Sequence, residues 1–272
     1  MSLTTYLRSK RFRNYFVDWV VTSVAMAYFF IVAEHARPFN RQFKLNDHTI
    51  QHPFTHEERV TGHMCLFLAA FVPSVSMTVG SFIKHRKNKD QALHLLQVSL
   101  LGAALTVSLD GIITDILKNW VGRPRPDFLE RCGAPSNTPT DVFVDISVCT
   151  APLGELRLID GMRSTPSGHS SISFSAFLFL AMWLFGQLQL SVNVASKPVY
   201  LYILSMSPLV LAAYVALSRV QDYRHHFSDI VSGMIIGCSV AVAVYRKYFH
   251  SVFAENSHEI NGEEDNSGVL PL

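Results

Sequence analysis

Two histidines and one aspartate in this chain have neighbours that suit nucleophilic and acid–base chemistry. His225 and Asp229 are four residues apart, so on a helix they would share one face. A carboxylate bonded to one imidazole nitrogen fixes the tautomer and leaves the other nitrogen as the nucleophile. His226 would lie about 100° further round such a helix and would not pair with Asp229 in the same way. The alternative explanation is a pair that only stabilises the helix.

Three cationic side chains have the chemistry to bind a phosphate group. Lys118 and Arg125 belong to the segment Lys-Asn-Trp-Val-Gly-Arg-Pro-Arg-Pro, and Arg219 lies just before His225. The guanidinium fork matches phosphate oxygens, and the ammonium adds a compact point charge. Prolines flank Arg125 and cannot continue a helix, so a helix should end near Trp120 with Arg125 in an extended segment beyond it. The alternative is that Lys118 and Arg125 snorkel at a membrane edge.

The segment Thr-Pro-Ser-Gly-His that ends at His169 predicts the start of a helix. Pro166 suits the first turn, Ser167 offers a hydroxyl, and Gly168 lets the backbone approach a ligand. The free N–H groups and the positive dipole end of a helix N-terminus bind anions. His169 would then reach the ester oxygen of a bound phosphate. The ordinary alternative is an N-cap followed by a surface histidine.

Long apolar segments must position these residues. Of the 272 residues, 49% are apolar and only 16% are charged, against about 25% charged in a soluble domain. A bilayer crossing needs about 20 mostly apolar residues, and six stretches qualify: 15–33, 60–83, 91–117, one within 164–196, 198–218 and 226–245. We therefore predict an all-α integral membrane bundle of six transmembrane helices over residues 1–250, followed by a disordered acidic tail over 251–272. The net charge of +2 argues against a nucleic-acid partner.

The positions of Lys and Arg predict how the bundle is oriented. Eleven of the 23 fall in the two termini and in the loops after the second and fourth spans: Arg8, Lys10, Arg11, Arg13, Lys84, Arg86, Lys87, Lys89, Lys197, Arg246 and Lys247. Cytosolic loops carry the excess of positive residues, so both termini should be cytosolic. The three candidate motifs then share the lumenal or exterior face, in or beside the loops after spans three and five.

The cysteines and the polar residues of the spans give smaller expectations. Cys132 and Cys149 share the long outer loop, where they form either a disulfide or two free thiols. Cys65 and Cys238 lie within spans and should be buried as small apolar residues. Asp115 is three residues before Lys118, so the two side chains could pair.

A metal site has one candidate, in the first outer loop. The residues His48, His52, His56 and Glu57 have a spacing that suits a helix, but Pro53 interrupts it. Fixed cations would instead neutralise a phosphate, so we predict no metal and no cofactor.

The three motifs together resemble the type-2 phosphatidic acid phosphatase superfamily, which shares its site with vanadium haloperoxidases. The pattern Lys-x6-Arg-Pro, Pro-Ser-Gly-His and Ser-Arg-x5-His-x3-Asp is complete. The sequence around these motifs is similar to that of the fungal diacylglycerol pyrophosphate phosphatases. The segments that carry this similarity include Arg125-Pro-Asp-Phe-Leu, Asp160-Gly, Gln221-Asp-Tyr-Arg-His-His-Phe and Phe39-Asn-Arg-Gln-Phe.

The resemblance implies a role for each matched residue. His225 would attack phosphorus and form a phosphohistidine, oriented by Asp229. His169 would protonate the leaving group and then activate water. The phosphoryl oxygens would be bound by Lys118, Arg125, Arg219, Ser167 and the Gly168 amide. The substrates it implies are diacylglycerol pyrophosphate, phosphatidate and lysophosphatidate, and the location is vacuolar or another endomembrane.

Other substrates and another class of function fit part of the sequence. A polyprenyl pyrophosphate or a sphingoid base phosphate would suit the same motifs. A lipid-phosphate binding or transport protein would also have six spans, but transporters usually place their site near the bilayer midplane. Here the cationic motifs lie at one face. One histidine must be neutral while the other is protonated, so we expect a bell-shaped pH dependence.

Overall fold

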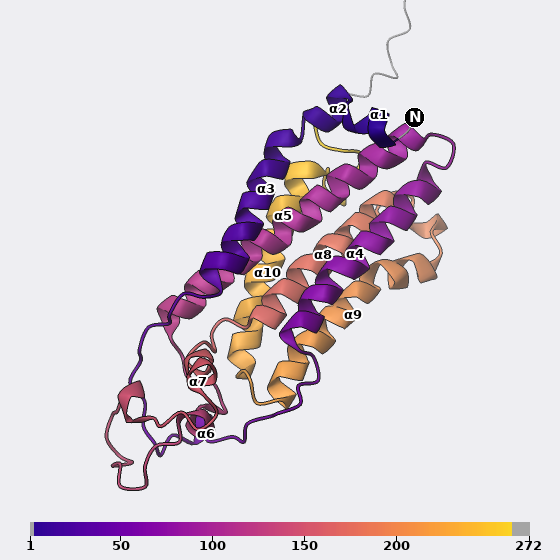
Figure 1. The fold of residues 1–272 in the computed structure, drawn as a ribbon. Helices are drawn as coiled ribbons and strands as arrows, with labels where there is room; N and C mark the ends of the chain where they lie inside the picture. Colours follow the sequence, from indigo (N-terminus) through magenta and orange to yellow (C-terminus); the bar gives the residue numbers. More distant parts are fainter. Residues whose placement is uncertain (1–2, 263–272) are drawn as a thin grey trace, which may run out of the picture.

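The computed structural model describes residues 3–262, and within them the prediction of an all-α membrane bundle is confirmed. Six helices are long and apolar enough to cross a membrane. They are α3 (Phe16–Tyr28) continued by the π-helix η1 (Phe29–Ala33), α4 (Gly62–Lys84), α5 (Lys89–Val121), α8 (Gly168–Gln187), α9 (Val199–Gln221) and α10 (Phe227–Tyr248). The bundle runs along one long axis (Figure 1).

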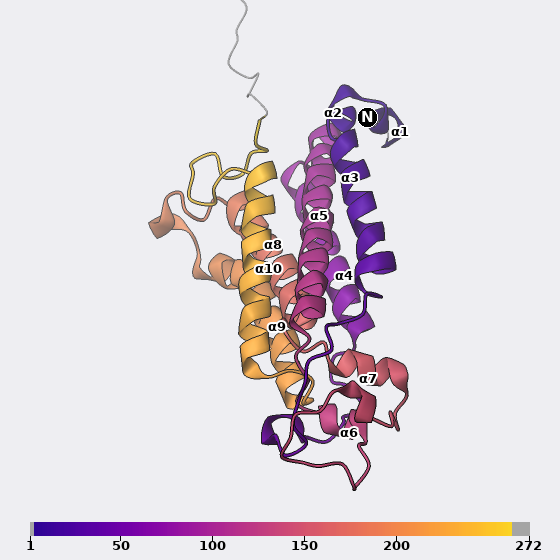
Figure 2. The same cartoon turned by 90° about the vertical axis from the view of Figure 1, so that its left-hand side faces the viewer.

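Helix α8 lies at the centre of the bundle. It packs against α4, α5, α9 and α10, whereas α3 lies on the outside against α5 (Figure 2). Its Trp183 is fully buried and donates a hydrogen bond from Nε1 to the Ser99 hydroxyl at 2.7 Å. Gly102 of α5 faces the Phe179 ring so closely that a Cβ would lie 2.6 Å from it. The central helix is therefore held by close packing against α5.

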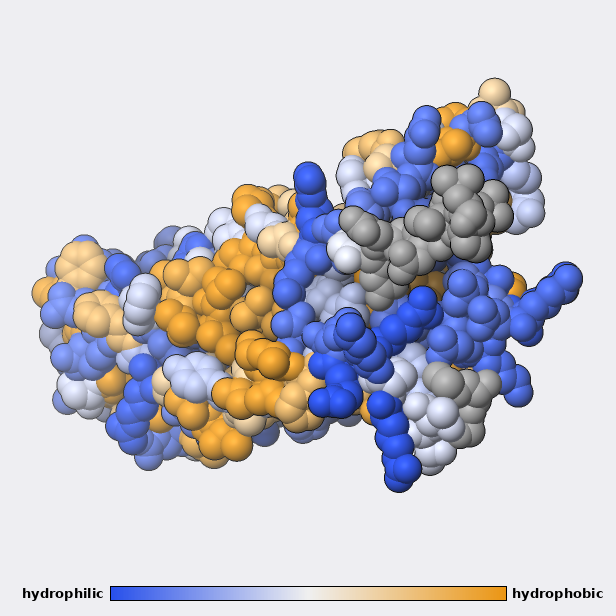
Figure 3. All heavy atoms as spheres, turned by 90° about the horizontal axis from the view of Figure 1, so that it is seen from above, coloured by the Kyte–Doolittle hydropathy of each residue, from blue (hydrophilic) through white to orange (hydrophobic). Residues whose placement is uncertain are grey.

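The outer surface matches a bilayer. An apolar belt lies between two hydrophilic ends (Figure 3). Large apolar side chains of the spans are more than half exposed, among them Val17, Ile31, Phe67, Ile203 and Val210. Such a surface would be unfavourable in water and suits contact with lipid chains.

The two ends of the bundle differ. The short helices α1 (Leu3–Leu7) and α2 (Lys10–Arg13) lie at one end, and α6 (Phe128–Cys132) and α7 (Glu155–Gly161) lie at the other (Figure 2). Short 3-10 turns lie at His48–Ile50, Ile146–Val148 and Val194–Ser196. Around α6 and α7 a small core forms from Phe43, Ile50, Phe128, Cys132, Leu158 and Met162. We call this part, with the loops that surround it, the cap.

The cysteines divide as expected between loop and spans. Cys132 and Cys149 form a disulfide within the cap, which is one of the two alternatives expected for them. Cys65 is buried and Cys238 is half-buried, and both are free thiols.

The folded part extends further than the expected boundary at residue 250. Residues 251–262 fold back on the bundle, where Ser257 is buried and Ile260 pairs with Phe249. Gln187 at the end of α8 donates to the His258 carbonyl at 3.2 Å. The rest of the predicted tail, 263–272, lies outside the described residues.

Candidate active site

A cavity of about 670 Å³ lies between the bundle and the cap. Six of the predicted site residues line it: Lys118, Arg125, Gly168, His169, Arg219 and His225. The other two, Ser167 and Asp229, are fully buried next to it, and the Ser167 amide donates to the Asp229 carbonyl at 3.0 Å. Three distant segments of the chain therefore meet at one end of the bundle.

The end of α5 positions Lys118 and Arg125. The helix stops at Gly122, which adopts the left-handed conformation with φ of 56°. A Cβ at Gly122 would lie 2.1 Å from the Phe39 carbonyl oxygen, so only glycine fits there. Beyond the helix, the Arg125 amide donates to the Gly161 carbonyl at 2.8 Å. The prediction that the helix ends near Trp120 is confirmed.

The start of α8 supplies the second part of the site. Ser167 is the N-cap, and its hydroxyl accepts from the Ser170 amide. A Cβ at Gly168 would lie 2.7 Å from Lys118 Nζ. The ammonium therefore occupies the space that a side chain at Gly168 would fill, at the positive end of the helix. Two positive groups meet there, an arrangement suited to an anion.

The third part of the site corrects the expected pairing of His225 with Asp229. Helix α10 begins at Phe227 and His226 is its extended N-cap, so His225 lies before the helix. His225 Nδ1 is 2.7 Å from the Ser164 carbonyl oxygen and 3.9 Å from the Asp229 carboxylate. His226, which was not expected to pair with Asp229 in the way of His225, is closer, with Nδ1 at 3.2 Å from Asp229 Oδ2. The prediction that His225 and Asp229 share a helix face was wrong, because α10 begins two residues after His225.

Asp229 is the centre of a dense set of hydrogen bonds. Its carboxylate accepts from the Ser164 hydroxyl at 2.6 Å, from the His226 amide at 2.9 Å and from the Thr165 hydroxyl. Arg123 Nη1 pairs with it at 2.8 Å. Asp229 thus joins the segment before α8 to the start of α10, and so fixes the Ser164 carbonyl that holds His225.

His169 lines the same cavity as His225 and lies on the first turn of α8. Its Nε2 lies 3.1 Å from the Val60 carbonyl oxygen. Because a carbonyl only accepts, this nitrogen carries a proton. The other ring nitrogen is left for proton transfer.

Each cation of the predicted site has a carboxylate partner. Lys118 Nζ is 3.3 Å from Asp115, as its spacing predicted. Arg125 pairs with Asp160 at 2.7 Å and Arg219 with Glu58 at 3.1 Å. Asp160 and Glu58 lie far from these partners in the chain.

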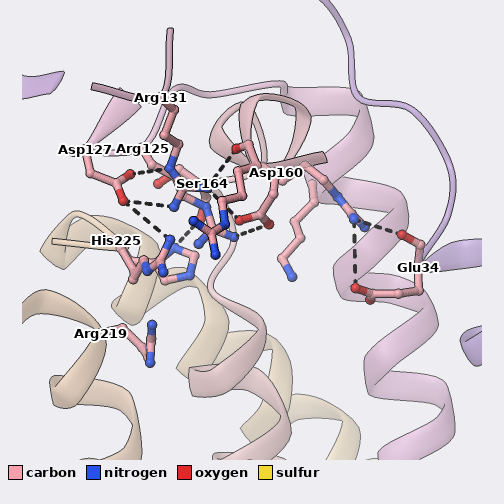
Figure 4. A network of polar contacts seen from close by, with 12 residues as sticks. Glu34, Arg125, Asp127, Arg131, Asp160, Ser164, Arg219 and His225 are labelled. Atoms are coloured by element: carbon pink, nitrogen blue, oxygen red, sulfur yellow. Dashed lines mark hydrogen bonds and ion pairs between the residues drawn. The ribbon is translucent and has the colours of Figure 1, made fainter. Parts of the chain in front are cut away.

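These pairs belong to a wider network that continues into the cap. Arg131 joins Asp127 and Asp160, at 2.9 Å from each, and Arg224 joins Glu58 and Asp127. Asp127 and Asp160 lie on either side of Arg131, and Glu34 lies on the side of the network away from His225 (Figure 4). This network thus holds Arg125 and Arg219 in place.

Burial and charge shift the pKa values of several groups outside the spans. Burial, opposed by the Asp229 contact and helped by the Arg125 charge, lowers the pKa of His225 to about 3. Burial and the neighbouring Asp115 raise the pKa of Glu34. Burial would raise the pKa of Asp160, but Arg125 and Arg131 outweigh it and lower that pKa. His225 is therefore neutral and Asp160 ionised at neutral pH.

Sequence reasoning missed four residues of this region: Glu58, Arg123, Asp160 and Arg163. Arg123 stands two residues before Arg125, and Arg163 two residues before Thr165, so proximity to a motif was the available signal. Asp160 stood in a segment that carries the family resemblance, but without a role, and Glu58 had no signal. Only the fold brings the two acids to their arginines.

Comparison with known proteins identifies a family for the chain. Residues 99–253 match the model of the PAP2 superfamily. The chain is 42% identical over 217 residues to "Diacylglycerol pyrophosphate phosphatase 1" of Saccharomyces cerevisiae, covering 79% of this chain and 73% of that protein. It is 39% identical to "Probable diacylglycerol pyrophosphate phosphatase 1" of Schizosaccharomyces pombe, covering 88% and 83%.

A plant relative is more distant. "Lipid phosphate phosphatase 1" of Arabidopsis thaliana is 35% identical over 61% of this chain and 50% of that protein. No solved structure matches the chain. The chain therefore belongs to the PAP2 superfamily and is a lipid phosphate phosphatase.

Proposed function

We propose that this protein hydrolyses lipid phosphomonoesters and lipid pyrophosphates, including phosphatidate and diacylglycerol pyrophosphate, through a phosphohistidine on His225. The observation that carries the proposal is the meeting of two histidines and three cations in one cavity. The two fungal relatives are named for activity on diacylglycerol pyrophosphate.

In the first step, His225 is the nucleophile. Its Nδ1 donates to the Ser164 carbonyl, which leaves the Nε2 lone pair for attack on phosphorus. The bond between phosphorus and the leaving oxygen breaks as His169 donates a proton to that oxygen. The leaving group is diacylglycerol from phosphatidate, or phosphatidate from the pyrophosphate. Lys118, Arg125 and Arg219 stabilise the charge on the transferring phosphoryl group.

In the second step, water attacks the phosphohistidine. His169 takes a proton from the water, the bond between phosphorus and Nε2 breaks, and inorganic phosphate leaves. His225 returns to its neutral form. Neither step uses a metal ion, because the three fixed cations supply the positive charge.

The cavity also fits a substrate that keeps its acyl chains in the bilayer. Part of its wall is apolar, formed by Phe29, Phe30, Leu66 and Ile172. Phe30 of η1 is 44% exposed. A phosphorylated headgroup would reach the cations while its chains stay between η1 and α4.

We further propose that both termini are cytosolic and that the cavity faces the lumen or exterior, in a vacuolar or other endomembrane. The distribution of Lys and Arg supports this orientation.

The test is phosphate release from both lipids in detergent micelles with a metal chelator present. We expect activity in the wild type and in His85→Ala, whose histidine lies at the other end of the bundle, and none in His225→Ala. Brief incubation with labelled substrate should label the wild type, and not His225→Ala, with acid-labile phosphate. Activity that the chelator abolishes, or that survives in His225→Ala, would contradict the proposal.

A further inference from the structure

One more arginine lines the same cavity and has no part in the three motifs. Arg163 comes from the segment between α7 and α8, and its side chain is 9% exposed. Nη1 donates to the Glu34 carbonyl at 2.8 Å. Within residues 3–262, Nε and Nη2 have no hydrogen-bond partner. A buried guanidinium with two unused donors is costly unless a ligand takes them.

The arginines that bind phosphate in the proposed mechanism have the same property. The Nε groups of Arg125 and Arg219 are also buried without a partner in the part of the chain that the structure describes. Arg163 therefore resembles them in burial, in unused donors and in lining the cavity.

Lys118 connects Arg163 to the rest of the site. Lys118 Nζ lies 3.3 Å from Asp115 Oδ1, and Arg163 Nη2 lies 3.6 Å from the same oxygen. Lys118 Nζ is also the atom nearest to a Cβ built on Gly168. The ammonium is thus close both to the start of α8 and to the carboxylate that Arg163 contacts.

The contacts of these groups suit a lipid pyrophosphate, in which the second phosphate, glycerol and the acyl chains follow the terminal phosphate that is attacked. His225, His169, Lys118, Arg163 and the apolar side chains of η1 all line the cavity. Lys118 and Arg163 share the Asp115 carboxylate, and Arg163 Nη1 donates to the carbonyl of Glu34, the residue at the end of η1. Arg163 thus connects Lys118 to the helix that supplies the apolar wall.

We propose that Arg163, next to Lys118, forms a second phosphate subsite, which binds the lipid-linked phosphate of a pyrophosphate substrate and sets the preference for pyrophosphates over monoesters. This inference rests on the proposed function. The reaction itself is unchanged, because Arg163 binds the leaving group and not the phosphoryl group that is transferred.

Two carboxylates near Arg163 would repel a phosphate, so the binding of a second phosphate depends on the positive charge of Arg163. Glu34 Oε1 lies 3.9 Å from Arg163 Nη1, and Asp115 lies within 3.6 Å of Nη2. Without the guanidinium, both acids would repel a phosphate placed there. A monoester lacks that phosphate, so it should be affected much less.

The test compares kcat/KM for diacylglycerol pyrophosphate and phosphatidate in wild type, Arg163→Gln, Arg163→Lys and Arg37→Gln. The last replaces an exposed cap arginine as the control. We expect Arg163→Gln to lower the ratio of the two values about ten- to hundredfold, as for the loss of charged hydrogen bonds. Arg163→Lys should recover part of the ratio, because it restores the charge without the fork. Arg37→Gln should leave the ratio unchanged.

Inhibition provides a readout that needs no pyrophosphate hydrolysis. With phosphatidate as substrate, inorganic pyrophosphate should inhibit Arg163→Gln more weakly than wild type, while inhibition by inorganic phosphate stays the same. Glu34→Gln should shift the ratio the opposite way, since it removes a repelling charge and keeps the arginine.

Equal losses on both lipids in Arg163→Gln, or a ratio within about twofold of wild type, would overturn the subsite. A wild type that hydrolyses neither lipid would instead count against the proposed function. A wild type active on phosphatidate, with equal inhibition by pyrophosphate before and after the substitution, would refute the subsite alone.

Discussion

At the scale of single residues, the pairing of each cavity cation with a carboxylate keeps the substrate-free site near neutrality. Lys118, Arg125 and Arg219 have Asp115, Asp160 and Glu58 as partners. Buried unpaired charges are strongly unfavourable, so these acids make the cations tolerable and also fix their direction. Arg125, for example, donates to Asp160 from Nη2, and its Nε has no hydrogen-bond partner among the described residues.

Replacing Asp160 should therefore affect both stability and substrate binding. In Asp160→Asn, Arg125 and Arg131 lose ion pairs at 2.7 and 2.9 Å. We expect the free energy of unfolding to fall by about 1–3 kcal/mol, with the lower part of the range favoured because the carboxylate is partly exposed. KM for phosphatidate should rise, as measured by initial rates. Asp141→Asn, at an exposed position of the same loop, is the control and should change neither quantity.

The low pKa of His225 predicts that protonation of this residue does not lower kcat/KM between pH 7 and 5. Burial lowers that pKa to about 3, so the neutral, nucleophilic form persists as the pH falls from 7 to 5. The acid limb of kcat/KM should then follow ionisation of the substrate phosphate, whose second pKa is about 6. The alkaline limb should report loss of the proton that the general acid donates.

Measuring kcat/KM from pH 4 to 9 with phosphatidate and with diacylglycerol pyrophosphate distinguishes ionisation of the substrate from ionisation of a histidine of the enzyme. The acid limb should move with the substrate. An acid limb fixed near pH 6.5 for both lipids would mean that an ordinary imidazole must lose a proton, and the depressed pKa would be wrong.

At the scale of elements, the long helices could be predicted closely. Apolar runs mark the spans, and Gly122 with the prolines around Arg125 marks the end of α5 to within two residues. The cap could not be predicted in the same way. Its helices α6 and α7 are short, and its polar contacts join residues far apart in the chain, such as Glu58 with Arg219.

One misprediction shows how sensitive side-chain placement is to a helix boundary. The i, i+4 rule applies only if both residues are helical. Because α10 starts at Phe227, His226 became the N-cap partner of Asp229 and His225 turned to the Ser164 carbonyl. The sequence was enough to name candidate residues and the local contact of Lys118 with Asp115, but not the contacts between distant segments.

The disulfide of the cap should contribute to stability. It links Cys132, adjacent to Arg131 of the ion-pair network, to Cys149, with a sequence separation of 17. A closed loop of this size stabilises by about 3 kcal/mol in the chain-entropy model. We expect Cys132→Ser/Cys149→Ser to lower Tm in detergent, with a matching loss when the wild type is reduced. Cys238→Ser, which removes a free thiol, is the control. An unchanged Tm in the double variant would contradict the prediction.

At the scale of the whole molecule, the opposite ends of the bundle allow a direct test of orientation. The chain contains no Asn-x-Ser/Thr acceptor for N-glycosylation. Pro139→Thr creates one at Asn137 in the cap loop, and Gly268→Thr creates one at Asn266 near the C-terminus. With a lumenal cap, only Pro139→Thr should gain a glycan, seen as a mobility shift that a glycosidase reverses. A glycan on Gly268→Thr alone would contradict the proposed orientation and indicate the opposite one.

The position of the cavity at one end of the bundle also bears on lipid traffic. The cavity lies at one end of the six candidate spans, so we expect it to receive lipid substrates from a single leaflet. Substrate made in the opposite leaflet has to flip across before it can be hydrolysed. Transbilayer movement, not catalysis, would then set the rate at which that pool is consumed. Phosphate and lipid product also separate in space, because phosphate leaves into the compartment that the cap faces while the lipid remains in the membrane.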